Sequence, residues 1–454
     1  MMDVFFHVVQ ALHGLLWGWP VLAVILLMGI NLSVRSGFFQ LVHARFWMRK
    51  TLFSIRKKDA VRENGLSPLQ AVSTALAGSI GTGNIVGVAS ALTIGGAGSL
   101  FWMWISAIFG MMTIFAENVL GMKYRVRDAS GVWRGGAMYY IAHGLRSPFL
   151  AKVFAGACVL ASLSMGNLAQ ANAISQVFSD SFGVSTWITG LLLGGGMLLI
   201  AAGGIRRTAR VAEKLVPGMA AGYLLVCFLV LFLCQKNLPA AIASIFTQAF
   251  DVRAAAGGIG GTLMMRGMQV GISRGIFTNE AGLGSSVMAH ASTEGTSPTE
   301  QGMWGILQVF IDTIVMCTVT GLCILASGAS VSGKDGAALS AEAFRSALGE
   351  AGGIFVACAI ALFAFATMLA WCCYGESGLR YLGGKGIVGY RVLFAAAAFL
   401  SCQMELQLVW DLSDICNGLM AIPNLAAVFW LSGEVLEELQ KDLRSREKHR
   451  RFRC

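Results

Sequence analysis

The sequence Thr74-Ala-Leu-Ala-Gly-Ser-Ile-Gly-Thr-Gly-Asn-Ile-Val-Gly87 interrupts an apolar segment, residues 69–94, that is long enough to cross a bilayer. Glycine is a poor helix former, and serine, threonine and asparagine compete for the backbone's hydrogen bonds. Lipid tolerates non-helical backbone only where protein or a water-filled cavity satisfies its polar groups. We therefore interpret the segment as a broken transmembrane helix whose freed amides and carbonyls bind a ligand. The alternative is a continuous helix whose small residues pack against a neighbouring helix.

The composition predicts a membrane protein. The chain is 56% hydrophobic and 13% charged, whereas a soluble domain carries about 25% charged residues. This favours an all-α polytopic protein that forms one helical bundle in the lipid bilayer. The net charge of +10 does not indicate a nucleic-acid partner, because the basic residues fall in short loops between apolar segments. The 11 cysteines show no metal-ligand spacing.

Eleven transmembrane helices are predicted, at residues 8–32, 69–94, 100–122, 151–178, 187–202, 216–234, 257–290, 303–326, 354–374, 392–402 and 406–431. Lysines and arginines collect in every second connection, beginning with the one after the first span, except at residues 290–302, which contain no lysine or arginine. The connections on the other side carry only Lys236, Arg253, Lys334 and Arg345. Basic residues stay on the cytoplasmic side. The charges therefore predict a multi-pass protein of the cell membrane, with its amino terminus outside and its carboxyl terminus in the cytoplasm.

The order of the spans predicts an inverted repeat. Residues 1–34 form an extra amino-terminal helix and residues 35–66 a basic cytoplasmic connection. Residues 67–235 form the first repeat, residues 236–431 the second, and residues 432–454 a basic cytoplasmic tail. The broken span opens the first repeat, and a second glycine-rich span, residues 257–290, opens the other from the opposite side of the membrane. In such folds two discontinuous helices meet at a binding site near the midplane. Within the second span, Arg274 and Glu280 are expected to neutralise each other.

Several motifs then resemble those of the sodium:alanine (amino acid–carrier) symporter family. They cover roughly residues 69–424 in the same order: Gly81-Thr-Gly-Asn-Ile-Val-Gly87, Phe101-Trp-Met-Trp104, Phe115-Ala-Glu117, Met138-Tyr-Tyr-Ile141, Arg274-Gly-Ile-Phe-Thr-Asn-Glu-Ala-Gly-Leu-Gly284, Phe310-Ile-Asp-Thr313 and Tyr374-Gly-Glu376. The resemblance implies a leucine-transporter-like fold, with ten core helices in two inverted repeats of five. It also implies symport of sodium with alanine or glycine, and of glutamine in some members. The chain departs from the family pattern at Ala97, Ala137, Val287-Met288 and Cys372-Cys373, which leaves the particular amino acid open.

The chemistry of an amino acid indicates which residues bind it. A carboxylate suits the amides and positive dipole of a broken helix end, and Ser79, Gly81 and Gly83 are the candidates there. By resemblance Gln170 contacts the substrate, with an interhelical hydrogen bond as the alternative. Phe277 could wall off the substrate's side chain. Thr367 and Trp371 share one helix face with Phe363, and a large aromatic there would restrict the site to a small neutral amino acid.

The resemblance also predicts a sodium site. Sodium prefers oxygen ligands, as hard cations do. The expected ligands are the carbonyls of Ala77 and Ile80 and the hydroxyl of Thr367, with Asn84 as a further candidate. Asp312 and Glu117 remain as proton-carrying or structural groups. A channel or an enzyme fits the sequence less well than a carrier, and no organic cofactor is expected. A proton-coupled amino-acid carrier and a sodium-coupled glutamine carrier remain as alternatives.

Overall fold

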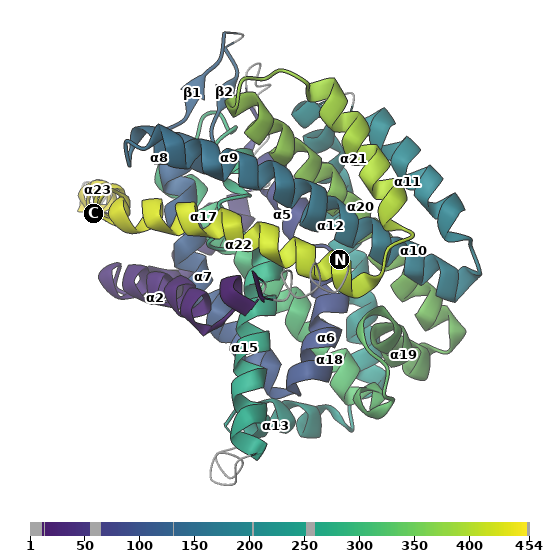
Figure 1. The fold of residues 1–454 in the computed structure, drawn as a ribbon. Coiled ribbons are helices and arrows are strands. Elements are labelled where there is room, and N and C mark those ends of the chain that lie inside the picture. Colours follow the sequence, from purple (N-terminus) through teal and green to yellow (C-terminus); the bar gives the residue numbers. More distant parts are fainter. Residues whose placement is uncertain are drawn as a thin grey trace.

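Helices form almost all of the structure, a computed structural model that describes residues 11–12, 14–54, 65–129, 131–201, 204–250 and 259–451. In this part of the chain the strands are confined to one small antiparallel hairpin, β1 (Val126–Arg127) with β2 (Trp133–Arg134). Figure 1 shows this hairpin at one end of the bundle, while α13 (Leu238–Ala249) and α19 (Gly336–Leu348) lie toward the other end.

Each of the eleven predicted spans contains at least one helix in the residues that the structure describes. The helices are α2 (Trp19–Arg35), α5 (Pro68–Ser79) with α6 (Val86–Gly95), α7 (Gly98–Lys123), α9 (Pro148–Leu163) with α10 (Ala169–Phe182), α11 (Thr186–Ala201), α12 (Gly204–Leu233), α15 (Ile259–Asn279) with α16 (Val287–His290), α17 (Pro298–Val309) with α18 (Thr318–Ala326), α20 (Glu350–Tyr381), α21 (Ile387–Ser401) and α22 (Leu406–Trp430). In the described ranges, seven helical segments are long and apolar enough to cross a membrane, and four further apolar helices are shorter.

The remaining helices connect the spans. They are α3 (Phe39–Val42), α4 (Ala44–Lys50), α8 (Ala137–His143), α13, α19 and a long carboxyl-terminal helix, α23 (Ser432–Arg451). Some predicted features lie outside the described residues: the start of the first span, the basic residues between positions 55 and 64, Arg253, Gly257 and Gly258, and the end of the tail.

Two of the spans are broken. The first break separates α5 from α6 at Ile80 and Gly81, and a short 3-10 turn, Thr82–Asn84, follows it. The second break lies between α15 and α16. It does not coincide with Gly260 and Gly261, which are helical. It begins at Glu280, whose φ of 61° is left-handed, and continues through Gly282 and Gly284. A left-handed backbone angle is unusual for a residue with a side chain, and it ends the helix abruptly.

Two π-helical turns interrupt other spans. One, Ser164–Leu168, joins α9 to α10, and the other, Phe310–Cys317, joins α17 to α18. The second turn contacts the 3-10 turn of the first break, and the first turn contacts α20, which itself meets that break. Such turns occur frequently at functional sites.

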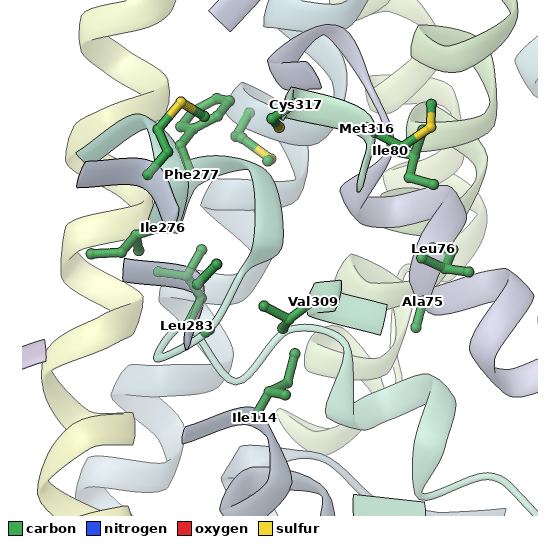
Figure 2. Close-up of a cluster of buried hydrophobic side chains, with 14 of the residues drawn as sticks. Ala75, Leu76, Ile80, Ile114, Ile276, Phe277, Leu283, Val309, Met316 and Cys317 are labelled. Carbon is green, nitrogen blue, oxygen red and sulfur yellow. The ribbon is translucent and has the colours of Figure 1, made fainter. Parts of the chain in front are cut away.

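Apolar side chains pack around both breaks. Figure 2 shows part of this core, drawn from α5, α7, α15, α17, the second break and the second π-helical turn. Ile80 and Leu283, which belong to the two breaks themselves, are fully buried. The polar groups that the breaks expose are therefore surrounded by hydrocarbon, so protein groups or a ligand must satisfy them.

Candidate functional site

The first break is built by close approach of three segments at Gly81. A Cβ atom at this position would lie 2.5 Å from Thr367 Oγ1 and 3.1 Å from Gln170 Oε1, so only glycine fits. The Gly81 amide donates to Asn84 Oδ1 at 3.0 Å, and the Thr82 amide donates to Gln170 Oε1 at 3.2 Å. Gln170 thus satisfies a backbone group that the break frees, and α10 and α20 both meet the break.

Three of the predicted sodium ligands lie together at this break. Thr367 Oγ1 lies 2.9 Å from the carbonyl oxygen of Ala77 and 3.4 Å from that of Ile80. It is also 3.1 Å from the carbonyl oxygen of Phe363, on its own helix. The Thr367 side chain is almost fully buried. These oxygens come from two spans far apart in the sequence, and they form a small group of hard donors.

Asn84 belongs to a second polar group. Its amide nitrogen donates to the carboxylate of Asp312 at 2.9 Å and to the Asp312 carbonyl at 3.0 Å. Thr313 Oγ1 donates to the same carboxylate at 2.9 Å, and Thr278 lies 3.4 Å from Thr313. The hydrogen bonds of Asn84 therefore lead to the second π-helical turn rather than to Thr367. This group contains a buried carboxylate, whereas the group at Thr367 contains only neutral oxygens.

Two more hydroxyls of the first break are buried without a partner. Within the described residues, neither Ser79 Oγ nor Thr82 Oγ1 makes a hydrogen bond. Most buried polar atoms are paired with protein or with ordered water. These hydroxyls are therefore available to a polar ligand. Gly83, the third predicted backbone contact, packs against α15, since its Cβ would lie 2.6 Å from Thr278 Cγ2.

Trp371 connects the two breaks. Its indole nitrogen donates to Glu280 Oε1 at 3.0 Å and to the Gly78 carbonyl at 3.3 Å. Ser285 Oγ donates to the other oxygen of Glu280 at 2.5 Å. The indole is fully buried, and it lies against the backbone of Gly166 in the first π-helical turn. The predicted substrate-facing aromatic thus lies between the two breaks.

The expected pairing of Arg274 with Glu280 is wrong. Arg274 Nη1 lies 3.7 Å from Asp414 Oδ2, and Glu280 instead bonds Trp371 and Ser285. Six residues of helix rotate a side chain by about 600°, so the two residues face different directions. Their spacing was the signal that could have excluded the pair. It could not have revealed Trp371 as the partner, because that contact joins segments 91 residues apart.

Phe277, near the end of α15, packs against α22. Its ring centre is 5.1 Å from that of Trp410. The Arg274 guanidinium lies 4.8 Å from the Trp410 ring and 5.6 Å from the Phe277 ring. Phe277 is almost fully buried, with Trp410 and Arg274 against its ring.

The second break is held by a network that sequence reasoning did not find. Glu117 Oε1 accepts hydrogen bonds from the Gly282 amide at 3.0 Å and from Asn424 Nδ2 at 2.5 Å. Asn424 Nδ2 also lies 2.8 Å from the Gly282 carbonyl and accepts a hydrogen bond from Tyr140 through Oδ1. Glu117 thus satisfies freed backbone of the break. Asn424 gave no signal, since a lone asparagine near the end of a span has no diagnostic pattern.

The fold is shared with a solved transporter. The crystal structure of MhsT in complex with L-phenylalanine superposes with a TM-score of 0.59 at 14% sequence identity, covering 83% of this chain and 93% of that one. At this identity the likeness concerns the fold alone. The predicted class, an all-α polytopic protein with a leucine-transporter-like fold, is confirmed.

The sequence comparisons define the family. AgcS of Methanococcus maripaludis, a sodium/alanine symporter, is 39% identical over 443 residues, which are 96% of this chain and 96% of that protein. GlnT of Bacillus subtilis, a probable sodium/glutamine symporter, is 36% identical over 455 residues, 98% of this chain and 92% of that protein. The family model described as the sodium:alanine symporter family matches residues 2–453. The chain therefore belongs to the sodium:alanine symporter family, whose members are multi-pass membrane transporters and not enzymes.

Proposed function

We propose that the protein is a secondary active transporter that couples sodium entry to the uptake of a small neutral amino acid, alanine or glycine, by alternating access. The observation that carries the proposal is the group of oxygens formed by Thr367, Ala77 and Ile80 at the first break. A desolvated sodium ion needs several oxygen ligands in place of its water. Carbonyls freed by a broken helix supply these oxygen ligands. Because no carboxylate takes part, the sodium ion is held weakly enough to be released.

Asn84 and Asp312 are our candidates for a second cation position. The Asp312 carboxylate would supply the negative charge, and the unpartnered hydroxyls of Ser79 and Thr82 lie on the break beside Asn84. A buried carboxylate is costly unless it is paired or neutralised. A sodium ion bound there would neutralise it.

The amino acid would bind at the first break. Its carboxylate would meet the amides and hydroxyl of Ser79, Gly81 and Gly83, because the amino end of a helix attracts anions. Gln170 would orient it from α10. Phe277 and Trp371 would limit the size of its side chain, since both are buried in a closely packed core. The amino terminus of the chain would lie outside the cell and its carboxyl terminus in the cytoplasm.

A proton-coupled carrier is the second candidate. It is favoured by three fully buried carboxyl groups, those of Glu117, Glu280 and Asp312, each within the membrane-spanning part of the bundle. Ionisable residues at this depth commonly mark ion or proton pathways. The two candidates differ in the gradient that drives uptake.

Uptake by purified protein in proteoliposomes tests the proposal. Labelled alanine, glycine and glutamine are offered with an inward sodium gradient, with an inward proton gradient and with neither. We expect alanine or glycine to accumulate only with the sodium gradient. Accumulation that follows the proton gradient alone would replace sodium coupling with the second candidate. A strong preference for glutamine would keep the coupling and change the substrate.

A further inference from the structure

A cavity of about 200 Å³ lies between α6, α10, α22 and the start of α19. Its walls include Ser90, Gln176, Asp180, Arg274, Asp335 and Trp410. A second cavity of about 190 Å³ shares Asp180, Ala337 and Ala338 with it, so the two form one cleft along α19. We call this cleft the outer cleft. Two of the helices that line it, α6 and α19, lie in Figure 1 away from the β1–β2 hairpin, toward the other end of the bundle.

The outer cleft ends at the wall of the buried site. Arg274 and Trp410 line it, and both lie against the ring of Phe277. Phe277 is 1% exposed, whereas Asp335 and Ala338 are exposed. A small molecule in the cleft would therefore be separated from the first break by one layer of side chains.

The charges of the outer cleft are arranged for a zwitterion. In the first cavity Arg274, which lies 3.7 Å from Asp414, is the cation of the inner wall, and Asp180 and Asp335 are anions of the outer walls. The second cavity adds Lys334 and Arg345, which both pair with Glu342. Arg274 is held in place by stacking on Trp410. Its Nη1 atom makes no hydrogen bond in the described residues, since the nearest carboxylate oxygen, on Asp414, is 3.7 Å away. A guanidinium in this state can accept a further carboxylate partner.

Asp335 is well placed for an ammonium group. One of its oxygens accepts the Gly336 amide at 2.5 Å and begins α19, which fixes the side chain at the rim. The neighbouring Lys334 does not neutralise it, because Lys334 pairs with Glu342 at 2.5 Å. The cavity that Asp335 lines, at about 200 Å³, is smaller than the roughly 300–1,000 Å³ of pockets for drug-sized ligands, which suits a small solute.

We propose that the outer cleft is a first binding site for a zwitterionic amino acid. The amino acid occupies this cleft without sodium and then moves on to the buried site. Arg274 receives the carboxylate and Asp335 the ammonium group, with Asp180 adding to the negative potential. The inference rests on the proposed function for its ligand class. The inference adds a second binding position for the amino acid. Binding there requires both the carboxylate and the ammonium group of the ligand, but it does not require sodium.

Cysteine protection tests this site. Ala338→Cys is introduced into a background without reactive native cysteines, and its modification by an impermeant methanethiosulfonate is timed in sodium-free buffer. We expect alanine to slow the modification severalfold. Alaninamide, which lacks the carboxylate, and propionate, which lacks the ammonium group, should not. If Ala338→Cys is not modified from outside, the cleft is closed to external water and the proposal fails.

Variants separate the outer cleft from the buried site. Arg274→Gln and Asp335→Asn should each remove the protection by alanine, and Asp335→Asn decides the matter if Arg274→Gln does not fold. Glu405→Gln removes an exposed acid at the start of α22 that lines neither cavity, and it should leave the protection intact. Gln170→Ala, in the buried site, should lower uptake while sodium-free protection persists.

The outcomes distinguish the two proposals. Protection that requires sodium, or that survives Asp335→Asn, would show that the ligand binds at the buried site alone. If the wild type takes up alanine with sodium but shows no sodium-free protection, only the outer cleft is refuted. If the wild type takes up no neutral amino acid, the proposed function fails as well.

Discussion

Thr367 is the residue at which α20 meets the first break, and its hydroxyl tests the proposed sodium site. Thr367→Val keeps the shape of the side chain and removes the oxygen within 3.4 Å of the Ala77 and Ile80 carbonyls. Losing a buried polar partner costs about 1–3 kcal/mol. The sodium concentration for half-maximal uptake should therefore rise by roughly 5- to 150-fold, while the protein still reaches the membrane.

Two further substitutions control for packing. Thr367→Ser keeps the oxygen and should recover most of the sodium response. Thr189→Val removes a buried hydroxyl that bonds only within its own helix, to the carbonyl of Ser185. It should leave the sodium dependence unchanged. An unaltered sodium response in Thr367→Val would place the ion elsewhere, with Asn84 and Asp312 as the next position.

The positions of single residues could be predicted from the sequence where they belong to a recognisable motif. The resemblance to the symporter family implied that the Thr367 hydroxyl lies near the carbonyls of Ala77 and Ile80, and the distances of 2.9 and 3.4 Å agree. The roles of Glu280 and Asn424 could not be derived, because each depends on a contact between distant spans. Hydropathy shows which segments enter the membrane. It carries no information about which faces of those segments meet.

At the scale of elements, the first π-helical turn is in close van der Waals contact with α20. A Cβ atom on Gly166 would lie 2.2 Å from Trp371 Cβ. Gly166→Ala should therefore displace the indole from Glu280 and the Gly78 carbonyl. Overpacking of this kind costs about 1–3 kcal/mol. We expect a lower melting temperature in detergent and a loss of most alanine uptake.

Gly156→Ala in the neighbouring α9 is the matched control. Nothing lies within 4 Å of a Cβ atom at this position. Alanine is favoured over glycine in a helix by about 1 kcal/mol, so stability should be unchanged or higher and uptake should be normal. If both alanine variants transport equally well, the close packing of Trp371 on the turn does not matter for function.

The sequence predicts some secondary-structure elements better than others. The eleven spans follow from runs of apolar residues, and the helices agree with them closely. The π-helical turns at Ser164–Leu168 and Phe310–Cys317 were not predicted, since one extra residue in a helical turn leaves no mark on hydropathy. The second break was expected within its span, but glycine content alone did not locate it at Glu280.

For the whole molecule, the arrangement of basic residues predicts the orientation in the membrane. Ser332 lies in the exposed loop before α19, and Ser445 lies on the exposed part of α23. In a cysteine-free background, Ser332→Cys should react with an impermeant thiol reagent added outside intact cells. Ser445→Cys should react only after the membrane is permeabilised. The opposite labelling pattern would invert the orientation and place the outer cleft on the cytoplasmic side.

The position of the Thr367 hydroxyl also bears on how fast an ion can be exchanged. Its single proton has three carbonyl acceptors within reach, those of Ala77, Phe363 and Ile80. A cation at the oxygen requires the proton to point away, and Phe363, one turn back on the same helix, can take it while the other two carbonyls turn to the ion. Loading would then need only rotation about one C–O bond, which belongs to the picosecond-to-nanosecond range of side-chain motion. Helix rearrangements take microseconds or longer, so turnover would be set by the moving bundle, with the ion already at equilibrium.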